Sequence, residues 1–457
     1  MTSGPRLVAV GDAPDPGRPR LLAVGDPPDP GRPRLLAVGD PPDPGRPRPV
    51  AVGDAPGRRR SLLAAVGDAP DPGPVGDAPD PGRPRLVVVG DPAGRRVAFF
   101  QDALRAAGLP VARAVSWPDV LRGRARFAAG ETVRLDSPGE DPEADRLLRG
   151  VDDPARVEGT GRWYGRFVAA VADLGRSVAE AGAVLVDDPA ELAVLFDKRL
   201  GHGRLRAAGV PVPASPTSGA DAPAVRGWTD VRALTAGSGM RRVFVKLAHG
   251  SSASGVLALE TTGAGRVQAT TSVERGADGR LFNSLRVRRY TSEREVAAIV
   301  DALAPDGLHV ERWLPKATQD GRAADLRVVV IDGRATHAVL RTSRSPMTNL
   351  HLGGARGDLA AARAAIAAAG GRWADALGVC ERAAAAFPGT RCVGVDLLPA
   401  SGWRRFAVGE VNAFGDLLPG LTGLPGSGAE GLDTYAAQVA ARFPHLYDIS
   451  TTGTSTT

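Results

Sequence analysis

The chain has 457 residues, 43% of them hydrophobic and only 5% aromatic, so it can bury a sizeable core of aliphatic side chains. Its net charge of +6 comes from scattered basic residues, with no basic run interleaved with aromatics, which argues against nucleic-acid binding. The two cysteines lack metal or redox spacing, no signal peptide is recognisable, and no apolar run reaches the roughly 20 residues that span a bilayer. These features predict a reduced, cytoplasmic, bacterial protein of two or three domains that binds neither nucleic acid nor membrane.

A 14-residue repeat, RLLAVGDPPDPGRP, occupies the first 84 residues. Each copy holds only four or five apolar residues, and its frequent prolines remove backbone donors and restrict their neighbours. We therefore expect residues 1–84 to be disordered, with a flexible interaction arm as the alternative.

The segments after the repeat follow the pattern of an α/β domain. A buried strand is expected at Leu86–Val89, then a helix that stops at Gly108, then a second strand at 111–115. This order predicts a parallel sheet with helices on its faces. A further helix is expected at 164–181 and a further strand at 183–186.

Two helix starts follow, and then strands dominate. Asp188 suits an N-cap, Pro189 suits the first helical position, and Glu191 is placed to complete a capping box. A second helix is expected at Lys198–Ala208, before Gly209. Later expected elements are a polar hairpin at 266–290, one helix at 357–386, and strands in VFVKLAHG, GVLALE, GLHVERWL, LRVVVIDG, ATHAVLRTS, CVGVDLLP and RFAVGEVN.

Lysine is rare in this arginine-rich chain, so each lysine is informative. Only Lys198, Lys246 and Lys316 occur among 57 basic residues. Lys246 ends an expected strand and is followed by GSSASG at 250–255, whose small residues let backbone N–H groups close on phosphate oxygens. The alternative interpretation is a surface hairpin.

The segment VERWLP offers a second candidate contact for a nucleotide. Backbone donors and acceptors near Glu311 can read an adenine edge, with Trp313 as an apolar wall. The alternative is a core tryptophan with salt-bridged neighbours.

Two acids and an amide near the end of the chain suit a metal ion. Asp396 and Glu410 are expected on adjacent strands joined by a Gly-Trp hairpin, and Asn412 shares a face with Glu410 because strand side chains alternate. Three oxygen ligands on one face suit Mg²⁺, although carboxylates paired with basic residues are the alternative. A further loop that can bind phosphate or carboxylate, or simply be solvated, contains Arg341, Arg344, Asn349 and Arg356.

In this order, these segments resemble the ATP-grasp superfamily, and within it the ribosomal-protein glutamate ligase and glutathione synthetase branch. The resemblance covers about Val184 to Gly420. It is carried by DK, AGVPVP, VKLAHGSSASGV, ERWL, DLRVVVIDG, TNLHLGG, VGVDLL and EVN. The fold it implies is an N-terminal parallel α/β domain followed by a two-subdomain ATP-grasp fold. The implied boundaries are a repeat at 1–84, an N-terminal domain at 85–196, an ATP-grasp domain at 197–445 with a lid at about 214–313 and a C-terminal subdomain at about 314–445, and a flexible tail at 446–457.

The resemblance also implies roles for individual residues. Cofactor-binding residues would be Lys198, Lys246, Gly250, Ser251, Ser252, Gly255, Glu311, Trp313, Leu314 and Asp325. Metal ligands would be Asp396, Glu410 and Asn412, holding Mg²⁺, two ions by expectation, with Mn²⁺ as an alternative. Catalytic contacts to phosphate and the transition state would come from Arg327, Arg341 and Asn349. His249 and His351 lie beside motifs and are expected to be plain hydrogen-bonding groups.

The activity implied is ATP-dependent joining of a carboxylate to an amine or thiol through an acyl phosphate, with small-molecule or peptide substrates. The loop after Asn412 departs from the family pattern of Glu-x-Asn, a small residue and Pro-Gly, so the amine cannot be carried over. Two alternatives stay open: a nucleotide-binding regulator or scaffold without ligase activity, and a kinase that stops at phosphoryl transfer. The oligomeric state is also open, with a homodimer as one candidate.

Overall fold

The computed structural model describes residues 84–251, 253–262, 265–415 and 418–443, all of which belong to one unit of the chain, Pro47–Thr457. The repeat before Pro84 and the tail at 446–457 lie outside these residues. The disorder expected for both therefore stays a prediction.

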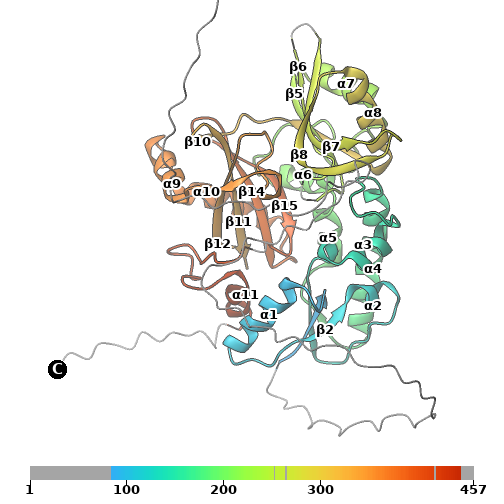
Figure 1. Cartoon of the computed structure of the whole chain (residues 1–457). Helices are drawn as coiled ribbons and strands as arrows, with labels where there is room; N and C mark the ends of the chain where they lie inside the picture. Colours follow the sequence, from blue (N-terminus) through green and yellow to red (C-terminus); the bar gives the residue numbers. More distant parts are fainter. Residues whose placement is uncertain (1–83, 252, 263–264, 416–417, 444–457) are drawn as a thin grey trace, which may run out of the picture. The chain divides into compact units, whose positions relative to one another are not determined.

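The described chain begins with a four-stranded parallel sheet of order β2-β1-β3-β4. Figure 1 labels its strand β2. Its strands are β1 (Arg85–Gly90), β2 (Arg113–Ser116), β3 (Glu131–Leu135) and β4 (Val184–Leu185). Helix α1 (Arg95–Ala106) connects β1 to β2, so the predicted strand–helix–strand unit is confirmed. Because strand side chains alternate, α1 packs against Leu86 and Val88, whereas α4 (Thr160–Glu180) packs against Val87 on the other face.

Helix α5 (Pro189–Leu195) begins as the sequence predicts but lacks the predicted capping box. The Asp188 carboxylate caps α5 by accepting a hydrogen bond from the backbone N–H of Glu191. The Glu191 side chain does not return to Asp188, because it accepts hydrogen bonds from Arg204 and from the distant Thr390. The other helices of this part are α2 (Trp117–Leu121), α3 (Pro142–Arg149) and α6 (Lys198–Ala207).

A five-stranded antiparallel sheet of order β8-β7-β6-β5-β9 follows. Its strands are β5 (Arg242–Leu247), β6 (Leu257–Thr261), β7 (Val267–Arg275), β8 (Leu281–Tyr290) and β9 (Leu308–Arg312). Helices α7 (Trp228–Gly237) and α8 (Glu293–Leu303) cover one face, where they share a core with Val245 and Val310. Alternation places the next residues along, Lys246 and Glu311, on the opposite face. The predicted polar hairpin is confirmed as β7 and β8.

A second antiparallel sheet has the order β13-β12-β11-β14-β15, with β10 pairing to β11. Its strands are β10 (Thr318–Gln319), β11 (Arg322–Ile331), β12 (Arg334–Ser343), β13 (Ala355–Arg356), β14 (Cys392–Pro399) and β15 (Phe406–Ala413). The single helix predicted at 357–386 is wrong. The chain forms α9 (Leu359–Ala368) and α10 (Trp373–Ala385), separated at Gly370, which has a positive φ of 83°. Helix α11 (Thr434–Arg442) packs against α1.

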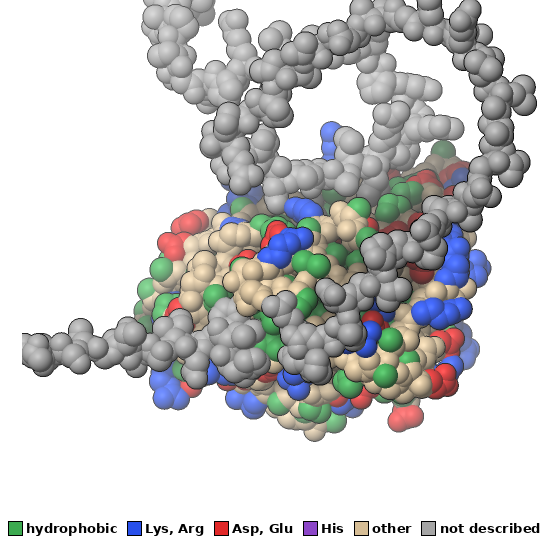
Figure 2. All heavy atoms as spheres, turned by 90° about the horizontal axis from the view of Figure 1, so that it is seen from below, with side chains coloured by type: hydrophobic (Ala, Val, Ile, Leu, Met, Phe, Trp, Pro, Cys, Tyr) green, Lys and Arg blue, Asp and Glu red, His purple; other side chains and the backbone are tan. Residues whose placement is uncertain are grey.

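The expected fold class is confirmed, because a parallel α/β sheet is followed by two helix-backed antiparallel sheets. On the face drawn in Figure 2, basic, acidic and hydrophobic side chains are intermixed. Among the described helices, none is both long and apolar enough to cross a membrane.

We expect a chain that lacks residues 2–84 to fold with the same thermal stability as the full chain, and to keep any ATP binding that the full chain has. The reason is that only the last repeat copy continues into a strand–helix–strand unit. In this unit β1 pairs with β2, and α1 connects them. Thermal unfolding and ATP titration of both chains test this. A shortened chain that fails to fold, beside a full chain that does, would make the repeat part of the structure.

Candidate active site

Lys198 lies at the start of α6 and reaches two distant parts of the chain. Its Nζ is 2.7 Å from Oε1 of Glu410 on β15, and it donates a hydrogen bond to the backbone carbonyl of Gly250. Asp197 fixes the start of the helix by accepting from the N–H groups of Arg199 and Leu200. The start of α6 thus places the Lys198 ammonium group against the sheet that holds the predicted metal ligands.

His249, just before Gly250, contacts Asp197 at the start of α6. Its Nε2 is 3.1 Å from Oδ2 of Asp197, and its ring stacks on Tyr164 with centroids 4.0 Å apart. Burial would raise the pKa of Asp197, but hydrogen bonds from His249 and Arg199 hold that pKa well below its ordinary value. An ionised Asp197 therefore anchors the loop before Gly250 to the start of α6.

Lys246 and Glu311 form a buried ion pair on the face of the five-stranded sheet away from its helices. The Lys246 Nζ is 2.5 Å from Oε1 of Glu311, whose side chain is 3% exposed. Burial raises the pKa of Glu311, but the Lys246 ammonium and the neighbouring His309 ring together bring the pKa down to about 2. His309 lies 3.4 Å from the second carboxylate oxygen and in turn contacts Thr217 at 3.0 Å. Glu311 is thus paired through Oε1, whereas its buried Oε2 has the 3.4 Å contact with His309 but no hydrogen-bond partner among the described residues.

The outer edge of β9, expected to read adenine, is partly used within the chain. The N–H of Val310 donates to the Thr217 hydroxyl at 2.8 Å, and the N–H of Arg312 donates to the Ala214 carbonyl at 2.8 Å. Beyond them, Trp313 is half-buried, with its ring 4.1 Å below the guanidinium of Arg242. The backbone left for adenine therefore lies beyond Arg312, towards the partly buried Leu314.

The described residues of the predicted phosphate loop, 250–251 and 253–255, lie close to Lys198, which donates to the Gly250 carbonyl. The N–H of Ser254 donates to the carbonyl of Ser251 at 2.8 Å, and Ser252 lies outside the described residues. Gly255 has a φ of 68°, and a Cβ there would come within 2.5 Å of Leu247. A side chain at Gly255 would therefore displace the loop.

The predicted metal ligands meet across strands β14 and β15. Asp396 and Glu410 are directly opposite in the register, and Asn412 opposes Gly394, to whose carbonyl its Nδ2 donates at 3.2 Å. Among the described residues, no three His, Cys, Asp or Glu side chains form a metal cluster, and the predicted set has two carboxylates and an amide. An all-oxygen donor set of this kind fits Mg²⁺, which keeps several waters and shares substrate phosphates.

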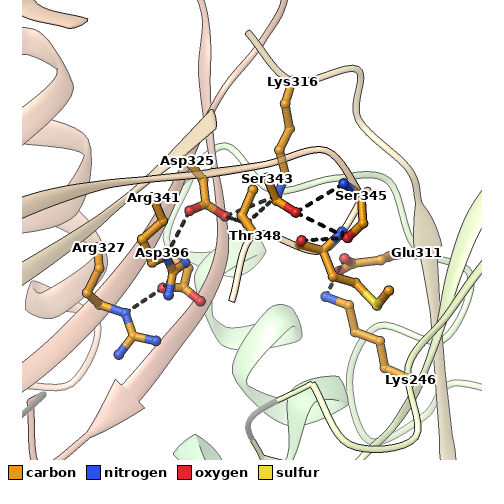
Figure 3. A network of polar contacts seen from close by, with 11 residues as sticks. Lys246, Glu311, Lys316, Asp325, Arg327, Arg341, Ser343, Ser345, Thr348 and Asp396 are labelled. Atoms are coloured by element: carbon orange, nitrogen blue, oxygen red, sulfur yellow. Dashed lines mark hydrogen bonds and ion pairs between the residues drawn. The ribbon is translucent and has the colours of Figure 1, made fainter. Parts of the chain in front are cut away.

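The predicted catalytic arginines lie beside Asp396 and Asp325 (Figure 3). Arg341 on β12 donates from Nε to Asp325 at 2.8 Å, and its Nη2 is 3.0 Å from Asp396. Arg327 on β11 donates from Nε to the same Asp396 oxygen at 2.6 Å. Asn349 lies in the loop after β12, where its carbonyl accepts from the Leu352 N–H at 3.0 Å. Asp325 contacts Arg341 directly, and its predicted contact with the nucleotide stays a prediction.

Four residues at the site were not predicted from the sequence: Thr217, His309, Lys316 and Thr348. Only Lys316 carried a signal, since it is one of three lysines. Thr217, His309 and Thr348 become buried partners of predicted residues only in the folded chain. A cavity of about 70 Å³ lies elsewhere, between β1, β3 and α11, and shares no residue with the site.

No family model matches the sequence, and no curated protein matches it. The ATP-grasp ligase PsnB, in complex with a minimal precursor, is 19% identical with a TM-score of 0.45, over 78% of this chain and 99% of PsnB. The macrocyclase MdnC from Microcystis aeruginosa MRC, bound with precursor peptide MdnA, is 11% identical with a TM-score of 0.43, over 79% and 99%. A RimK domain protein from Sphaerobacter thermophilus is 16% identical with a TM-score of 0.40, over 79% and 98%.

This chain resembles the ATP-grasp ligases. Identities of 19% and below and TM-scores of 0.45 and below carry no argument about the activity of this chain or the roles of its residues. The roles of individual residues rest on the contacts described above.

Proposed function

We propose that this chain is an ATP- and Mg²⁺-dependent carboxylate–amine ligase that acts through an acyl phosphate. One observation carries the proposal: two of the three lysines are partly buried and form ion pairs with acids of the predicted site. They are the pairs Lys198–Glu410 and Lys246–Glu311, and both lysines are about 15% exposed. Unneutralised charges are costly to bury, so paired lysines at this depth suit a site whose ligand is a polyanion.

The ion pairs keep the site electrically balanced without a nucleotide. When ATP binds, its phosphates would replace Glu410 at Lys198, and the Glu410 carboxylate would become available to a metal ion. Lys246 can contact a phosphate while Glu311 holds it, because an ammonium group has three donors. Bound Mg²⁺ would be held by Asp396, Glu410 and Asn412 and would supply neutralising charge at the phosphates.

An apolar patch beside Trp313 suits the adenine ring. Phe244 and Trp313 lie with ring centroids 5.4 Å apart, and Met347 and Leu352 pack in the same cluster. An aromatic and aliphatic wall beside polar strand backbone is typical of nucleotide pockets.

The chemistry needs no nucleophilic side chain. A substrate carboxylate oxygen forms a bond to the γ-phosphorus while the bond from that phosphorus to the bridging oxygen of ADP breaks. An amine then attacks the carbonyl carbon, the bond to the phosphate oxygen breaks, and inorganic phosphate leaves while the amine releases a proton. The chain's part is to hold the reactants in line and to neutralise charge, for which Arg327 and Arg341 are placed beside the acids.

The test is a screen for ADP release from MgATP with paired carboxylates and amines, including amino acids and peptides with acidic side chains. ADP that appears only with both substrates, together with a joined product in mass spectra, supports the ligase. A stable phosphorylated product from one substrate would instead show a kinase. Tight MgATP binding with no ADP from any mixture would show a regulator or scaffold.

A further inference from the structure

The cavity of about 70 Å³ that lies outside the candidate active site is bounded by the parallel sheet, α11 and the end of β11. Figure 1 shows α11 beside α1, and the other side of α11 packs in a core with β11 and β14. An engineered cavity of about 150 Å³ takes up benzene, so this one has room for a ligand of a few heavy atoms. Apolar side chains form much of its lining: Leu86, Phe100, Ile331, Phe414 and Val439.

An acid lies deep in this cavity. Asp187 follows β4, lines the cavity and is 8% exposed. Burial raises the pKa of Asp187 to about 6, because the Arg134 guanidinium and the Leu135 backbone offset only part of the cost of desolvation. At pH 8 the carboxyl group is nonetheless ionised. The apolar walls therefore surround a buried negative charge.

Two arginines at the same cavity already have acidic partners. Arg134 lies 3.5 Å from Asp136, which is 1% exposed. Arg391 lies 3.0 Å from Asp332, and both of these residues line the cavity. The ion pairs among the described residues do not include Asp187. In that part of the chain, Asp187 is thus an acid of the cavity without a counter-ion.

The chemistry of the cavity favours an organic cation as its ligand. The remaining charged residue of the lining, Arg442, is exposed, so water can solvate its charge. A carboxylate that is buried without a counter-ion is costly, and a ligand with a positive charge would remove this cost. A metal ion would need several oxygen ligands, which these apolar walls do not supply. An alkyl chain that carries an ammonium group matches both the acid and the walls.

We propose that this cavity binds a small primary ammonium ion, whose charged group pairs with Asp187 while its short alkyl chain contacts the apolar walls. The cavity shares no residue with the candidate active site, so the proposal does not depend on the proposed ligase function. Three parts of the fold line it: the parallel sheet, the second antiparallel sheet and α11. A ligand that binds only the folded chain should therefore stabilise the place where they meet.

The experiment titrates propylammonium chloride into the full chain at pH 8 by calorimetry and records thermal unfolding in its presence. Propanol is the neutral probe of similar size, and sodium chloride at equal ionic strength is the salt control. Propylammonium should bind about tenfold more tightly than propanol, because only the cation forms a charge-assisted hydrogen bond with Asp187. It should also raise the midpoint of thermal unfolding beyond the effect of sodium chloride.

Three variants locate the binding. Asp187→Asn keeps the shape of the side chain and should weaken propylammonium binding by about tenfold or more. Asp332→Asn is the matched control, since it removes an acid of the same cavity that is already paired with Arg391, and affinity should stay within about twofold. Thr132→Leu keeps Asp187 but fills part of the cavity, so binding should weaken by several fold.

Loss of binding in Asp187→Asn but not in Asp332→Asn supports the proposal. A full chain that does not bind propylammonium overturns it and indicates a cavity filled by water. Equal affinities for propylammonium and propanol, unchanged affinity in Asp187→Asn, or equal losses in Asp187→Asn and Asp332→Asn also overturn it. If Asp187→Asn does not fold, Thr132→Leu decides: weaker binding supports the site, and unchanged binding overturns it.

Discussion

Glu410→Ala is expected to lower ATP turnover by about 100-fold or more, because it removes a carboxylate that the proposal assigns to the metal ion. The structure adds a second, substrate-independent result. Glu410 is the ion-pair partner of Lys198 at 2.7 Å, so its removal releases a cation for the phosphates. ADP should then bind without Mg²⁺ at least as tightly as to the wild type, while the gain in affinity from added Mg²⁺ should disappear.

Calorimetric titration of ADP with and without Mg²⁺ measures both effects. Glu180→Ala, at the exposed end of α4, is the matched control and should keep the Mg²⁺ dependence of the wild type. If Glu410→Ala keeps that dependence too, Glu410 does not bind the metal ion.

Lys246→Met is expected to lower the free energy of unfolding by about 3–5 kcal/mol, because it leaves a buried carboxylate without its cation. The partner, Glu311, is 3% exposed and lies 2.5 Å from Lys246 Nζ. MgADP affinity should fall in the same variant, since the proposed phosphate contact is lost. Adding Glu311→Gln should recover most of the stability but not the affinity, because the unpaired charge is removed while the lysine remains absent.

Urea unfolding and calorimetry measure the two effects. Arg105→Met is the matched control: it removes an exposed ion pair with Asp102 and should change stability little. Recovery of both properties in the double variant would show that Lys246 acts only in the fold.

The stability that the Lys246–Glu311 pair contributes should depend on pH. The pKa of Glu311 falls from its ordinary 4.5 to about 2, so the folded state binds fewer protons than the unfolded state between these values. The contribution is therefore complete above about pH 4.5 and declines as the pH falls towards 2. The variant Lys246→Met/Glu311→Gln should lack this part of the acid sensitivity of the wild type.

Local elements could be predicted where neighbours in the sequence decide them. The spacing of apolar residues identified α1, and Gly108 after it has the positive φ of 69° that ends a helix. The same reasoning failed at Glu191, because its carboxylate accepts hydrogen bonds from Arg204 and Thr390, which are distant in the sequence. It also merged α9 and α10, because the alanine-rich pattern favours helix on both sides of the glycines at 370 and 371, where the helix breaks.

The sequence by itself determined the residue types of the site, the alternation that puts Glu410 and Asn412 on one strand face, and the rarity of lysine. Only the tertiary structure decided the partners: Lys198 with Glu410, Lys246 with Glu311, and Lys316 with Asp325. The physical reason is that strand periodicity is local, whereas a buried charge takes whichever opposite charge the packing of separate sheets and helices brings within reach.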